Sequence, residues 1–453
     1  MFHTFARACA PFVIALTALP IAAQDTTRME EVVTAEADSG AFMGAILVAN
    51  DTGTVMEGAW GSANLEWDIA NTIDTKFRIA SVTKQFTAAA AMLLDQNGQL
   101  DLDAPISDYL EDTPDTWSAI TVRHLMRHTS GLPNYTSLEK FPEIMRLEMR
   151  YDDLVATFRD LPLEFEPGSK FSYSNSGYYL LSRIVENASK TELGEYLNNN
   201  FFIPLGMKDT GFDDALTIIP KRAAGYIPGE DGPGNTDFID MSIPWGAGAI
   251  YSTVGDLNKW NKGLYGGTIL SKDSLAEFVT PTPYDALGSS KYAHGIAVAD
   301  ADEGTFYWHS GGINGFNAWL GYDPTRKISV SVLANLNGGA ASQLGNQLMT
   351  LAQGGEIKLT SERSETAIPA EAMAELEGVY ALAPTFKITI FVEDGALLAQ
   401  ATGQGANELF REEGDKYFLK VVNAQIHFTR DESGAVTGLT LFQGGQELPA
   451  PKE

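Results

Sequence analysis

Strand-like apolar segments lie at residues 45–50 and again within 290–335, and helical patterns occupy much of the chain between them. The first segment, AILVAN, is followed by the turn residues Asp51-Thr52-Gly53, which predicts a β-hairpin. The later region holds three strand patterns, TFYWHS, FNAWLGYDP and KISVSVLAN. Strands at both ends of a region with helices between them predict an α+β domain, whose antiparallel sheet joins the N- and C-terminal segments.

The clearest helical pattern starts at Ser81 and continues through VTKQFTAAAAMLLDQNG. This segment is rich in strong helix formers, and Gly98 is expected to end the helix. Further helices are expected over 25–40 and 120–127, and after Asn175 through GYYLLSRIVENAS. We therefore expect helices to flank the sheet over a first domain of residues 24–360.

The pattern changes after residues 361–370, SERSETAIPA, which are polar and predict a linker. Beyond the linker, short strand patterns alternate with turns at a spacing typical of a small antiparallel β-barrel, predicted over residues 371–453. The strand patterns are GVYAL, FKITIFVED, ALLAQAT, KYFLKVV, AQIHFTRD and VTGLTLFQ.

Residues 1–23 combine a short basic start at Arg7, the apolar stretch PFVIALTALPIAA and a small-residue ending. This pattern predicts a secretory signal peptide that is cut after Ala23, because the apolar run is shorter than the ~20 residues of a membrane-spanning helix. We therefore expect a periplasmic or secreted protein with no membrane span after signal removal. Cys9 is the single cysteine, so the mature chain would lack disulfides, thiol catalysis and cysteine metal ligands.

The chain carries 59 acidic and 31 basic residues, a formal net charge of -28. Such acidity repels nucleic-acid phosphates and anionic lipids, so we expect no nucleic-acid partner. The glycine pairs lack the spacing of a phosphate-binding loop. His124 and His128 are four residues apart, but no third metal ligand accompanies them. We therefore expect no cofactor and no metal.

Ser81-Val82-Thr83-Lys84 is the best candidate for catalysis. Three residues of separation at the start of a helix place the lysine ammonium one turn from the serine hydroxyl. A serine is a poor nucleophile until a neighbour takes its proton, and a desolvated lysine can do so. Lowering the lysine pKa from about 10.4 to about 7 costs roughly 4–5 kcal/mol, so such a lysine must be buried.

A second copy of this spacing, Ser137-Leu138-Glu139-Lys140, lies in a polar loop. For any single copy, the alternative interpretation is a solvated lysine and a helix-capping serine. Ser81 differs because it follows an apolar segment and opens an Ala/Leu-rich helix. That helix can bury Lys84 and direct its amide dipoles at a developing oxyanion.

The second element is Tyr173-Ser174-Asn175, just before a predicted helix. A phenol near a cationic lysine can become phenolate-like and relay protons. Asn175 can hydrogen-bond both Lys84 and a substrate. A second copy, Tyr196-Leu197-Asn198, lies within a predicted helix and is interpreted as ordinary packing.

The third element is His309-Ser310-Gly311-Gly312, where a predicted strand leads into a turn. Adjacent glycines let a substrate backbone come close, and the amides of Gly312 and Ser81 could form an oxyanion hole. The alternative for His309 is a structural imidazole on an edge strand.

In this order, the three elements resemble those of the penicillin-recognising serine hydrolases, and within them the class C β-lactamase family, also called serine peptidase family S12. The resemblance covers about residues 30–355 and implies a sheet flanked by helices plus an all-helical subdomain. Residues 371–453 resemble the lipocalin-like barrel appended to some peptidases of this family. The resemblance extends to FRIASVTKQFTA, LMRHTSGLP, FEPGSKFSYSNSGY, MKDTGF and GAGAIYSTVGDL.

The resemblance also implies roles for individual residues. Ser81 would be acylated, and Lys84 would be the base that activates it. Tyr173 would pass a proton to the leaving group and activate water for deacylation. The amides of Ser81 and Gly312 would hold the oxyanion, and substrate would contact Asn175, His309, Gly311 and Gly312.

His309 is a departure, because β-lactamases typically have a lysine here that helps to hold the drug carboxylate. A histidine near Lys84 should be largely neutral at pH 7, because a like charge lowers its pKa from about 6.5. We therefore predict an exported serine hydrolase of short or D-amino-acid-containing peptides. The alternatives are an esterase for short acyl esters, a β-lactamase and a non-catalytic binding module, and the barrel could drive homo-oligomer formation.

Overall fold

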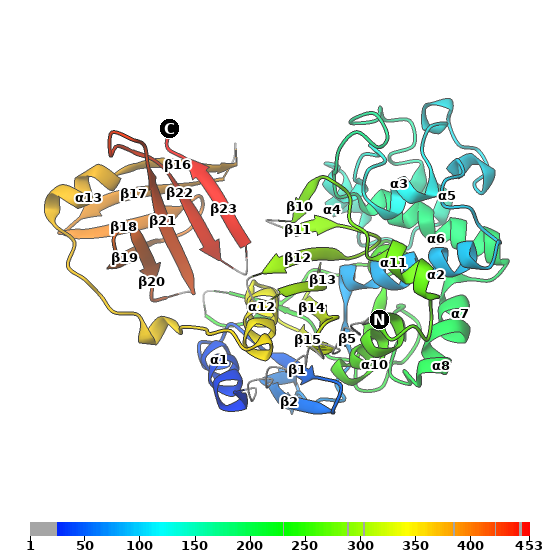
Figure 1. The fold of residues 1–453 in the computed structure, drawn as a ribbon, viewed down its shortest axis with the longest axis horizontal. Helices are drawn as coiled ribbons and strands as arrows, with labels where there is room; N and C mark the ends of the chain where they lie inside the picture. Colours follow the sequence, from blue (N-terminus) through cyan, green and yellow to red (C-terminus); the bar gives the residue numbers. More distant parts are fainter. Residues whose placement is uncertain are drawn as a thin grey trace, which may run out of the picture.

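The computed structural model describes residues 25–229, 231–287, 290–301, 304–383, 386–421, 423–443 and 446–453. The predicted signal peptide, residues 1–23, lies outside the described residues. Figure 1 shows a larger body of sheet and helices and a smaller β-barrel, connected by an extended segment that carries short helices.

The larger body is built on an antiparallel sheet of eight strands in the order β10-β11-β12-β13-β14-β15-β1-β2. Strand β1 (Gly44–Ala49) lies between its hairpin partner β2 (Thr54–Trp60) and β15 (Ile328–Ala334), with Gly44 opposite Ala334. This confirms that the sheet joins the N- and C-terminal segments. The other strands are β10 (Asp285–Leu287), β11 (Ser290–Tyr292), β12 (Ala297–Ala301), β13 (Gly304–Ile313) and β14 (Phe316–Asp323).

Both faces of this sheet are covered, which explains why all six residues of β1 are buried. On one face, Ile46 and Val48 pack with α1 (Thr26–Asp38) and α12 (Ala340–Gln353). On the other face, Ala45 and Leu47 belong to the larger core, which includes α2 (Thr83–Gln96) and α10 (Val254–Tyr265). The alternation of side chains along one strand therefore joins two helical layers.

A mostly helical subdomain packs against α2 on the side away from the barrel (Figure 1). Its central helix, α6 (Asn175–Ser189), makes its most extensive contacts with α2 and with α9 (Trp245–Gly248). The predicted helices at 25–40, from Ser81, at 120–127 and after Asn175 are all present. The remaining helices are α3 (Val122–Met126), α4 (Phe141–Ile144), α5 (Tyr151–Val155), α7 (Leu193–Leu197), α8 (Ile203–Leu205) and α11 (Lys272–Phe278).

Seven short strands complete the larger body. Strand β9 (Ile250–Ser252) lies between β5 (Phe77–Arg78) and β6 (Gly211–Phe212) in a three-stranded sheet. Two small hairpins lie elsewhere: β3 (Ser62–Asn64) with β4 (Ile69–Ala70), and β7 (Tyr226–Ile227) with β8 (Gly234–Asn235).

The smaller body is a nearly closed antiparallel barrel of eight strands, which confirms the predicted architecture. Its ends meet where Tyr380 pairs with Lys452 and the Glu453 N–H donates to the Val379 carbonyl at 2.9 Å. Tyr380, Tyr417 and Phe428 are buried with aliphatic side chains in its interior. The strands are β16 (Gly378–Ala383), β17 (Phe386–Glu393), β18 (Ala396–Ala401), β19 (Ala406–Glu413), β20 (Lys416–Leu419), β21 (Ala424–Arg430), β22 (Val436–Gln443) and β23 (Gln446–Pro451).

Three barrel elements were not expected from the sequence. Helix α13 (Ala370–Leu376) precedes the first strand, and its Leu376 is fully buried in the barrel core. Strand β19 has the sequence ANELFREE. Its charged residues mask the strand pattern, and Leu409 is its only buried side chain. Strand β23 contains two prolines, which are depleted in strands because they cannot donate a backbone hydrogen bond. Pairing with β22 nevertheless holds β23 in place.

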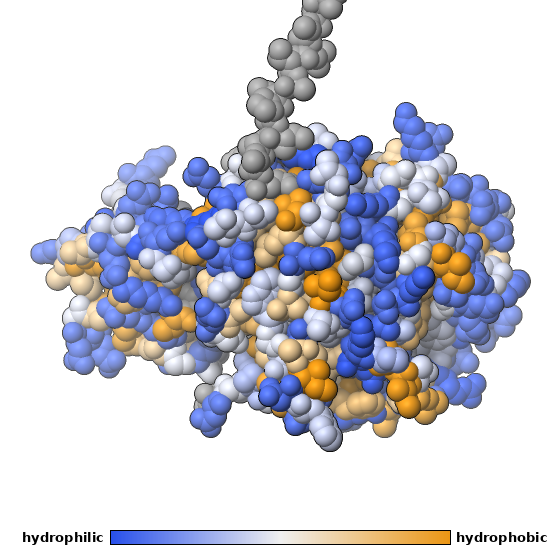
Figure 2. Space-filling model, turned by 90° about the horizontal axis from the view of Figure 1, so that it is seen from below, coloured by the Kyte–Doolittle hydropathy of each residue, from blue (hydrophilic) through white to orange (hydrophobic). Residues whose placement is uncertain are grey.

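Within the described residues, no helix is long and apolar enough to cross a membrane. On the face seen in Figure 2, hydrophobic side chains are interspersed with hydrophilic ones. The structure therefore adds no further candidate for a membrane span among the described residues.

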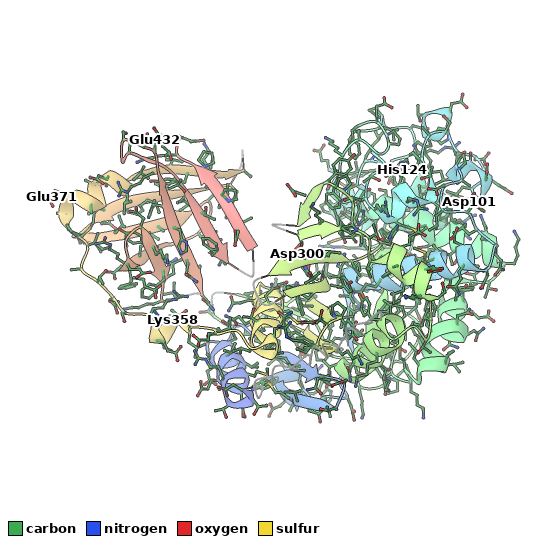
Figure 3. All side chains as sticks on the ribbon, viewed as in Figure 1. Asp101, His124, Asp300, Lys358, Glu371 and Glu432 are labelled. Atoms are coloured by element: carbon green, nitrogen blue, oxygen red, sulfur yellow. The ribbon has the colours of Figure 1, made fainter. Side chains whose placement is uncertain are left out.

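Ion pairs and amide contacts join the two bodies. Arg28 of α1 pairs with Glu362, and Lys358 and Arg363 both pair with Glu412 of β19. Lys358 lies where the connecting segment leaves the larger body (Figure 3). The segment predicted as a linker, residues 361–370, thus contacts both bodies.

Gly345 lies where α12 packs closely against the sheet. A Cβ at this position would lie 2.2 Å from the ring of Trp319, which is fully buried. We expect Gly345→Ala to lower the free energy of unfolding by about 1–3 kcal/mol, although alanine favours helix by ~1 kcal/mol. Ser342→Ala, on the same helix, is the matched control. Urea unfolding followed by tryptophan fluorescence measures both variants, and a Gly345→Ala protein as stable as wild type would contradict this packing.

Candidate active site

Ser81 lies in a single 3-10 turn, Ala80–Val82, that leads directly into α2. Ala80 has a φ of 47°, a conformation that is uncommon for a residue with a side chain and that marks local strain. Strand β13 packs against this turn through Gly311, where a Cβ would lie 2.2 Å from the Ile79 carbonyl oxygen. The glycine is therefore required for the strand to approach Ser81.

Lys84 lies one helical turn after Ser81 and is fully buried. Its Nζ lies 3.1 Å from Ser81 Oγ, 2.8 Å from Asn175 Oδ1 and 2.8 Å from the Ala247 carbonyl oxygen. The Nζ thus has contacts with the 3-10 turn before α2, with the start of α6 and with α9. Desolvation holds the pKa of Lys84 well below its usual value of 10.5, because no carboxylate is among these contacts.

Tyr173 lies against Lys84 and is hydrogen-bonded to Ser81. Lys84 Nζ is 4.9 Å from the centroid of its ring. Burial raises the pKa of Tyr173 above its usual value of 10, so the phenol is protonated in the free protein. Burial thus disfavours both a charged lysine and a charged phenol, and the phenolate character that a cationic lysine could induce stays a prediction.

Asn175 begins α6, and hydrogen bonds at both the oxygen and the nitrogen orient its side-chain amide. Its Oδ1 accepts from Lys84 Nζ, and its Nδ2 donates to Thr136 Oγ1 at 3.1 Å. The backbone N–H of Asn175 donates to Asn134 Oδ1 at 3.0 Å. An amide nitrogen carries two hydrogens, so one donor remains available to a substrate.

A cavity of about 210 Å³ opens beside Ser81. Asn175 and Gly312 line it, as expected for groups that contact substrate, whereas Gly311 faces the turn that carries Ser81. Its walls include the apolar side chains Tyr135, Phe141, Ile239, Ile243 and Ile313. The cavity therefore combines a polar floor at the serine with apolar walls.

Comparison with known proteins gives the family of this site. A family model described as Beta-lactamase matches residues 29–353, well over half of the chain and all of the site residues described above. The chain belongs to the beta-lactamase family. A second model, described as Domain of unknown function (DUF3471), matches residues 362–450, which include most of the barrel.

Relatives of the beta-lactamase family span one or both bodies. Penicillin-binding protein 4* of Bacillus subtilis strain 168 is 24% identical over 427 residues, 90% of this chain and 94% of the relative. The D-aminopeptidase of Brucella anthropi is 27% identical over 324 residues, 69% of this chain and 59% of the relative. With this family membership, the chain is a serine hydrolase of the S12 type.

Two solved structures show the same fold. The octameric penicillin-binding protein homologue from Pyrococcus abyssi has a TM-score of 0.67 and 25% identity, covering 94% of this chain and 100% of that one. The D-amino acid amidase from Ochrobactrum anthropi SV3, complexed with L-phenylalanine amide, has a TM-score of 0.64 and 26% identity. This second match covers 72% of this chain and 97% of the amidase chain.

His309, the departure from the β-lactamase pattern, is not among the residues that line the cavity. Its side chain is buried, its Nδ1 lies 2.5 Å from the Ser310 carbonyl oxygen, and its Nε2 lies 2.9 Å from the hydroxyl of Tyr292. Nδ1 therefore donates to the carbonyl, and Nε2 accepts from Tyr292. Desolvation, with Lys84 adding to it, lowers the pKa of His309 to about 3. Both nitrogens are thus engaged, and neither is free to bind a substrate in this arrangement.

Sequence reasoning missed the aromatic cluster behind Tyr173. His128 lies 4.1 Å from Tyr173 between ring centroids and 4.8 Å from Tyr292, and it is also close to Tyr178. Burial holds the pKa of His128 well below its usual value, and its Nε2 has no hydrogen-bond partner among the described residues. The HTSG sequence marked this loop, but the sequence gives no sign of which rings His128 contacts.

The second motif copies lie outside this arrangement. Ser137 Oγ accepts from Asn134 Nδ2, and Lys140 is exposed. Tyr196 is buried in α7, as expected for ordinary packing. His124 accepts at Nδ1 from the Thr121 N–H in a capping box, and the described residues hold no cluster of three metal-ligating side chains.

The buried His309 makes stability depend on pH. Its pKa is about 3 when folded, against about 6.5 in an unfolded chain, so unfolding takes up a proton between these values. Its contribution to stability is complete above pH 6.5 and falls as the pH drops toward 3. We expect His309→Gln, which keeps an amide donor and acceptor but cannot be protonated, to make this fall shallower by up to about 1.4 kcal/mol per pH unit.

Urea unfolding at pH 7, 6 and 5 measures this difference in slope. His427→Gln in the barrel, where burial lowers the pKa less strongly, serves as the control. Parallel stability curves for wild type and His309→Gln would contradict the buried neutral imidazole.

Proposed function

We propose that this protein hydrolyses amide bonds in short or D-amino-acid-containing peptides through an acyl-enzyme on Ser81. One observation carries the proposal. A neutral amine has two hydrogens, and Lys84 Nζ has two neighbours that can only accept, Asn175 Oδ1 and the Ala247 carbonyl oxygen. The nitrogen lone pair is therefore left for the hydroxyl of Ser81 at 3.1 Å.

Acylation follows from this arrangement. Lys84 Nζ takes the proton as Ser81 Oγ forms a bond to the substrate carbonyl carbon, and the carbonyl oxygen becomes an oxyanion. The amides of Ser81 and Gly312 would stabilise the oxyanion. Tyr173 then gives its proton to the leaving amine as the carbon–nitrogen bond breaks, and it is reprotonated from Lys84. The products of this half-reaction are a free amine and an ester on Ser81.

Deacylation uses the same groups with water as the nucleophile. Lys84 Nζ takes a proton from water through the hydroxyl of Tyr173, which passes its own proton to Lys84 as it accepts one, and the resulting hydroxide adds to the ester carbon. Collapse of the second oxyanion breaks the bond between the carbon and Ser81 Oγ, and Lys84 returns the proton to Ser81 Oγ. A carboxylic acid leaves, and the free enzyme is restored.

The cavity and the relatives support an amide substrate. The names D-aminopeptidase and D-amino acid amidase describe relatives that share the catalytic fold. The apolar walls beside Ser81 suit an uncharged side chain next to the scissile bond. Because His309 is neutral and does not line the cavity, this position offers no cation to hold a drug carboxylate, which disfavours efficient β-lactam hydrolysis.

Intact-mass spectrometry with D-peptides, short acyl esters and penicillin tests this proposal. We expect a single acyl adduct on wild type and on Ser137→Ala, and none on Ser81→Ala, because Ser81, unlike Ser137, contacts a buried amine. Peptide turnover should fall at least about 10³-fold in Ser81→Ala and stay unchanged in Ser137→Ala. An adduct on Ser81→Ala would favour a non-catalytic binding module, and a peptide-to-ester ratio of kcat/KM near zero would favour an esterase.

We also propose that the protein is exported and that its signal peptide is cut after Ala23. The support is the basic start, apolar stretch and small-residue ending of residues 1–23. N-terminal sequencing of the protein from the periplasm or the culture medium should begin at Gln24. A chain that begins at Met1 and stays in the cytoplasm would contradict export.

Self-association is the last part of this proposal. The Pyrococcus abyssi homologue, which is named as octameric, covers 94% of this chain and therefore spans both bodies. The interior of the barrel is filled by its own side chains, so the barrel can act only through its outer surface. Contacts between copies are one use for such a surface.

A further inference from the structure

The cavity beside Ser81 shares part of its lining with a second hollow. Gly312, Ile313 and Asn314 line both, and the second hollow is more open and has a volume of about 410 Å³. The second hollow lies between the end of β13 with the turn that follows it, and two residues of the β7–β8 region: Ile227 in β7 and Thr236, which follows β8. A chain bound at Ser81 can therefore continue over this turn without entering the protein core.

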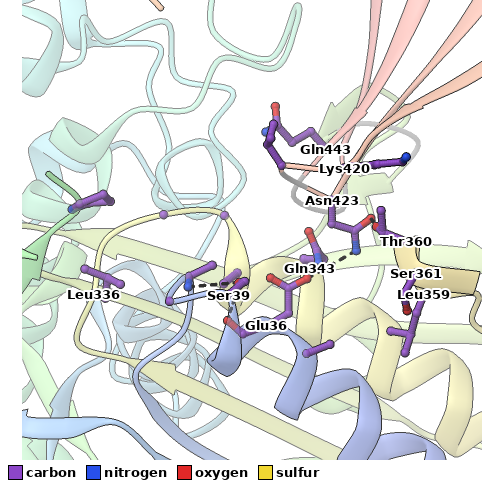
Figure 4. Close-up of a pocket in the computed structure, with 18 of the residues that line it drawn as sticks. Glu36, Ser39, Leu336, Gln343, Leu359, Thr360, Ser361, Lys420, Asn423 and Gln443 are labelled. Atoms are coloured by element: carbon purple, nitrogen blue, oxygen red, sulfur yellow. Dashed lines mark hydrogen bonds between the residues drawn. The ribbon is translucent and has the colours of Figure 1, made fainter. Parts of the chain in front are cut away.

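The second hollow shares one lining residue with a cavity between the two bodies. Asn337 lines both, and the interdomain cavity has a volume of about 840 Å³. The interdomain cavity is defined here by Glu36 and Gln343 of the larger body, Arg363 of the connecting segment, and Lys420, Asn423 and Gln443 of the barrel. Figure 4 shows side chains from α1, α12 and the barrel converging on it.

The interdomain cavity offers hydrogen-bonding groups, and the cations that line it are paired. Arg363 pairs with Glu412, and Lys420 with Glu365 at 2.7 Å. Glu36 is half-buried, its pKa is raised by desolvation, and it accepts from Gln343 and Asn423. A phosphate or another anion would find no unpaired cation among these groups, whereas an amide chain finds donors and acceptors.

The loops around this cavity leave it open. Gly232 and Gly338 both have positive φ values, 117° and 154°, and a Cβ at either position would meet nothing within 4 Å. Pro228 and Pro233 lie in the loop that joins β7 to β8 and restrict the backbone of this wall. Loop backbone therefore forms part of the rim of the cavity.

We propose that the interdomain cavity is a distal subsite for the uncharged main chain of a peptide whose scissile amide lies at Ser81. This inference rests on the proposed peptide hydrolysis. The barrel then forms one wall of the substrate site, and longer peptides gain contacts that shorter ones cannot reach. Remote contacts of this kind raise kcat/KM when they hold the reacting bond in position.

Two variants fill the interdomain cavity from opposite sides. Ser361→Trp acts from the connecting segment and Gln443→Trp from the barrel, and both residues line the cavity. Glu432→Trp, in an exposed turn at the far end of the barrel, is the matched control (Figure 3). Asn337 is unsuitable as a variant because its Nδ2 and Oδ1 hold the turn that carries Gly312, through Ile313 and Gly315.

The test is kcat/KM for neutral peptides of two to eight residues, in one series lengthened before the scissile bond and in another lengthened after it. We expect wild type and Glu432→Trp to favour the longest peptide of one series over the dipeptide by about tenfold or more. Ser361→Trp and Gln443→Trp should lose that preference and keep the wild-type rate on the dipeptide. Equal length dependence in all four proteins, or none in wild type, would overturn the distal subsite.

A binding measurement separates this inference from the proposed function. Fluorescence anisotropy of a dye-labelled neutral octapeptide is followed on Ser81→Ala, with and without Ser361→Trp. We expect the second substitution to weaken binding about tenfold, and equal affinities would overturn the subsite. If no peptide is cleaved but binding still depends on Ser361, the proposed function fails and the cavity remains a peptide site.

Discussion

The structure depends on the burial of a single amine, that of Lys84. Three segments that are distant in the sequence place Ser81, Asn175 and the Ala247 carbonyl around Nζ. Removing this group from water lowers its pKa, which costs several kcal/mol when the shift is several units. That cost is offset by the largest hydrophobic core of the protein, in which α2, α6 and α10 pack on the sheet. The core therefore keeps water, which would stabilise the protonated amine, away from Lys84.

The residues packed around Lys84 and Ser81 leave this pair accessible to a substrate from one side only. The strained turn at Ala80 and the missing side chain at Gly311 bring β13 against Ser81. Neutral rings fill the space behind, where His128 and His309 both have lowered pKa values. A charged histidine at either position would repel a protonated Lys84, and a neutral one avoids adding a second buried charge.

Sequence patterns predicted the main elements and the residues around Lys84, because helix formers, strand alternation and motif spacing are local. They could not predict Ala247 as a partner, since a backbone carbonyl leaves no trace in side-chain identity. They placed His309 at the substrate, whereas its orientation depends on Tyr292, which is distant from every motif that was recognised. Strand β19 and helix α13 escaped because burial of Leu409 and Leu376 by the closed barrel outweighs their local polarity.

The central claim is that burial lowers the pKa of Lys84 well below its usual value, and the titration of Lys84 tests that claim most directly. Nuclear magnetic resonance of the protein labelled with 15N in its lysine side chains follows each Nζ with pH, and a Lys84→Met variant assigns the signal. The account predicts that the Lys84 signal titrates well below 10.5, apart from exposed lysines such as Lys140. A Lys84 amine that stays protonated up to about 10.5 would contradict it.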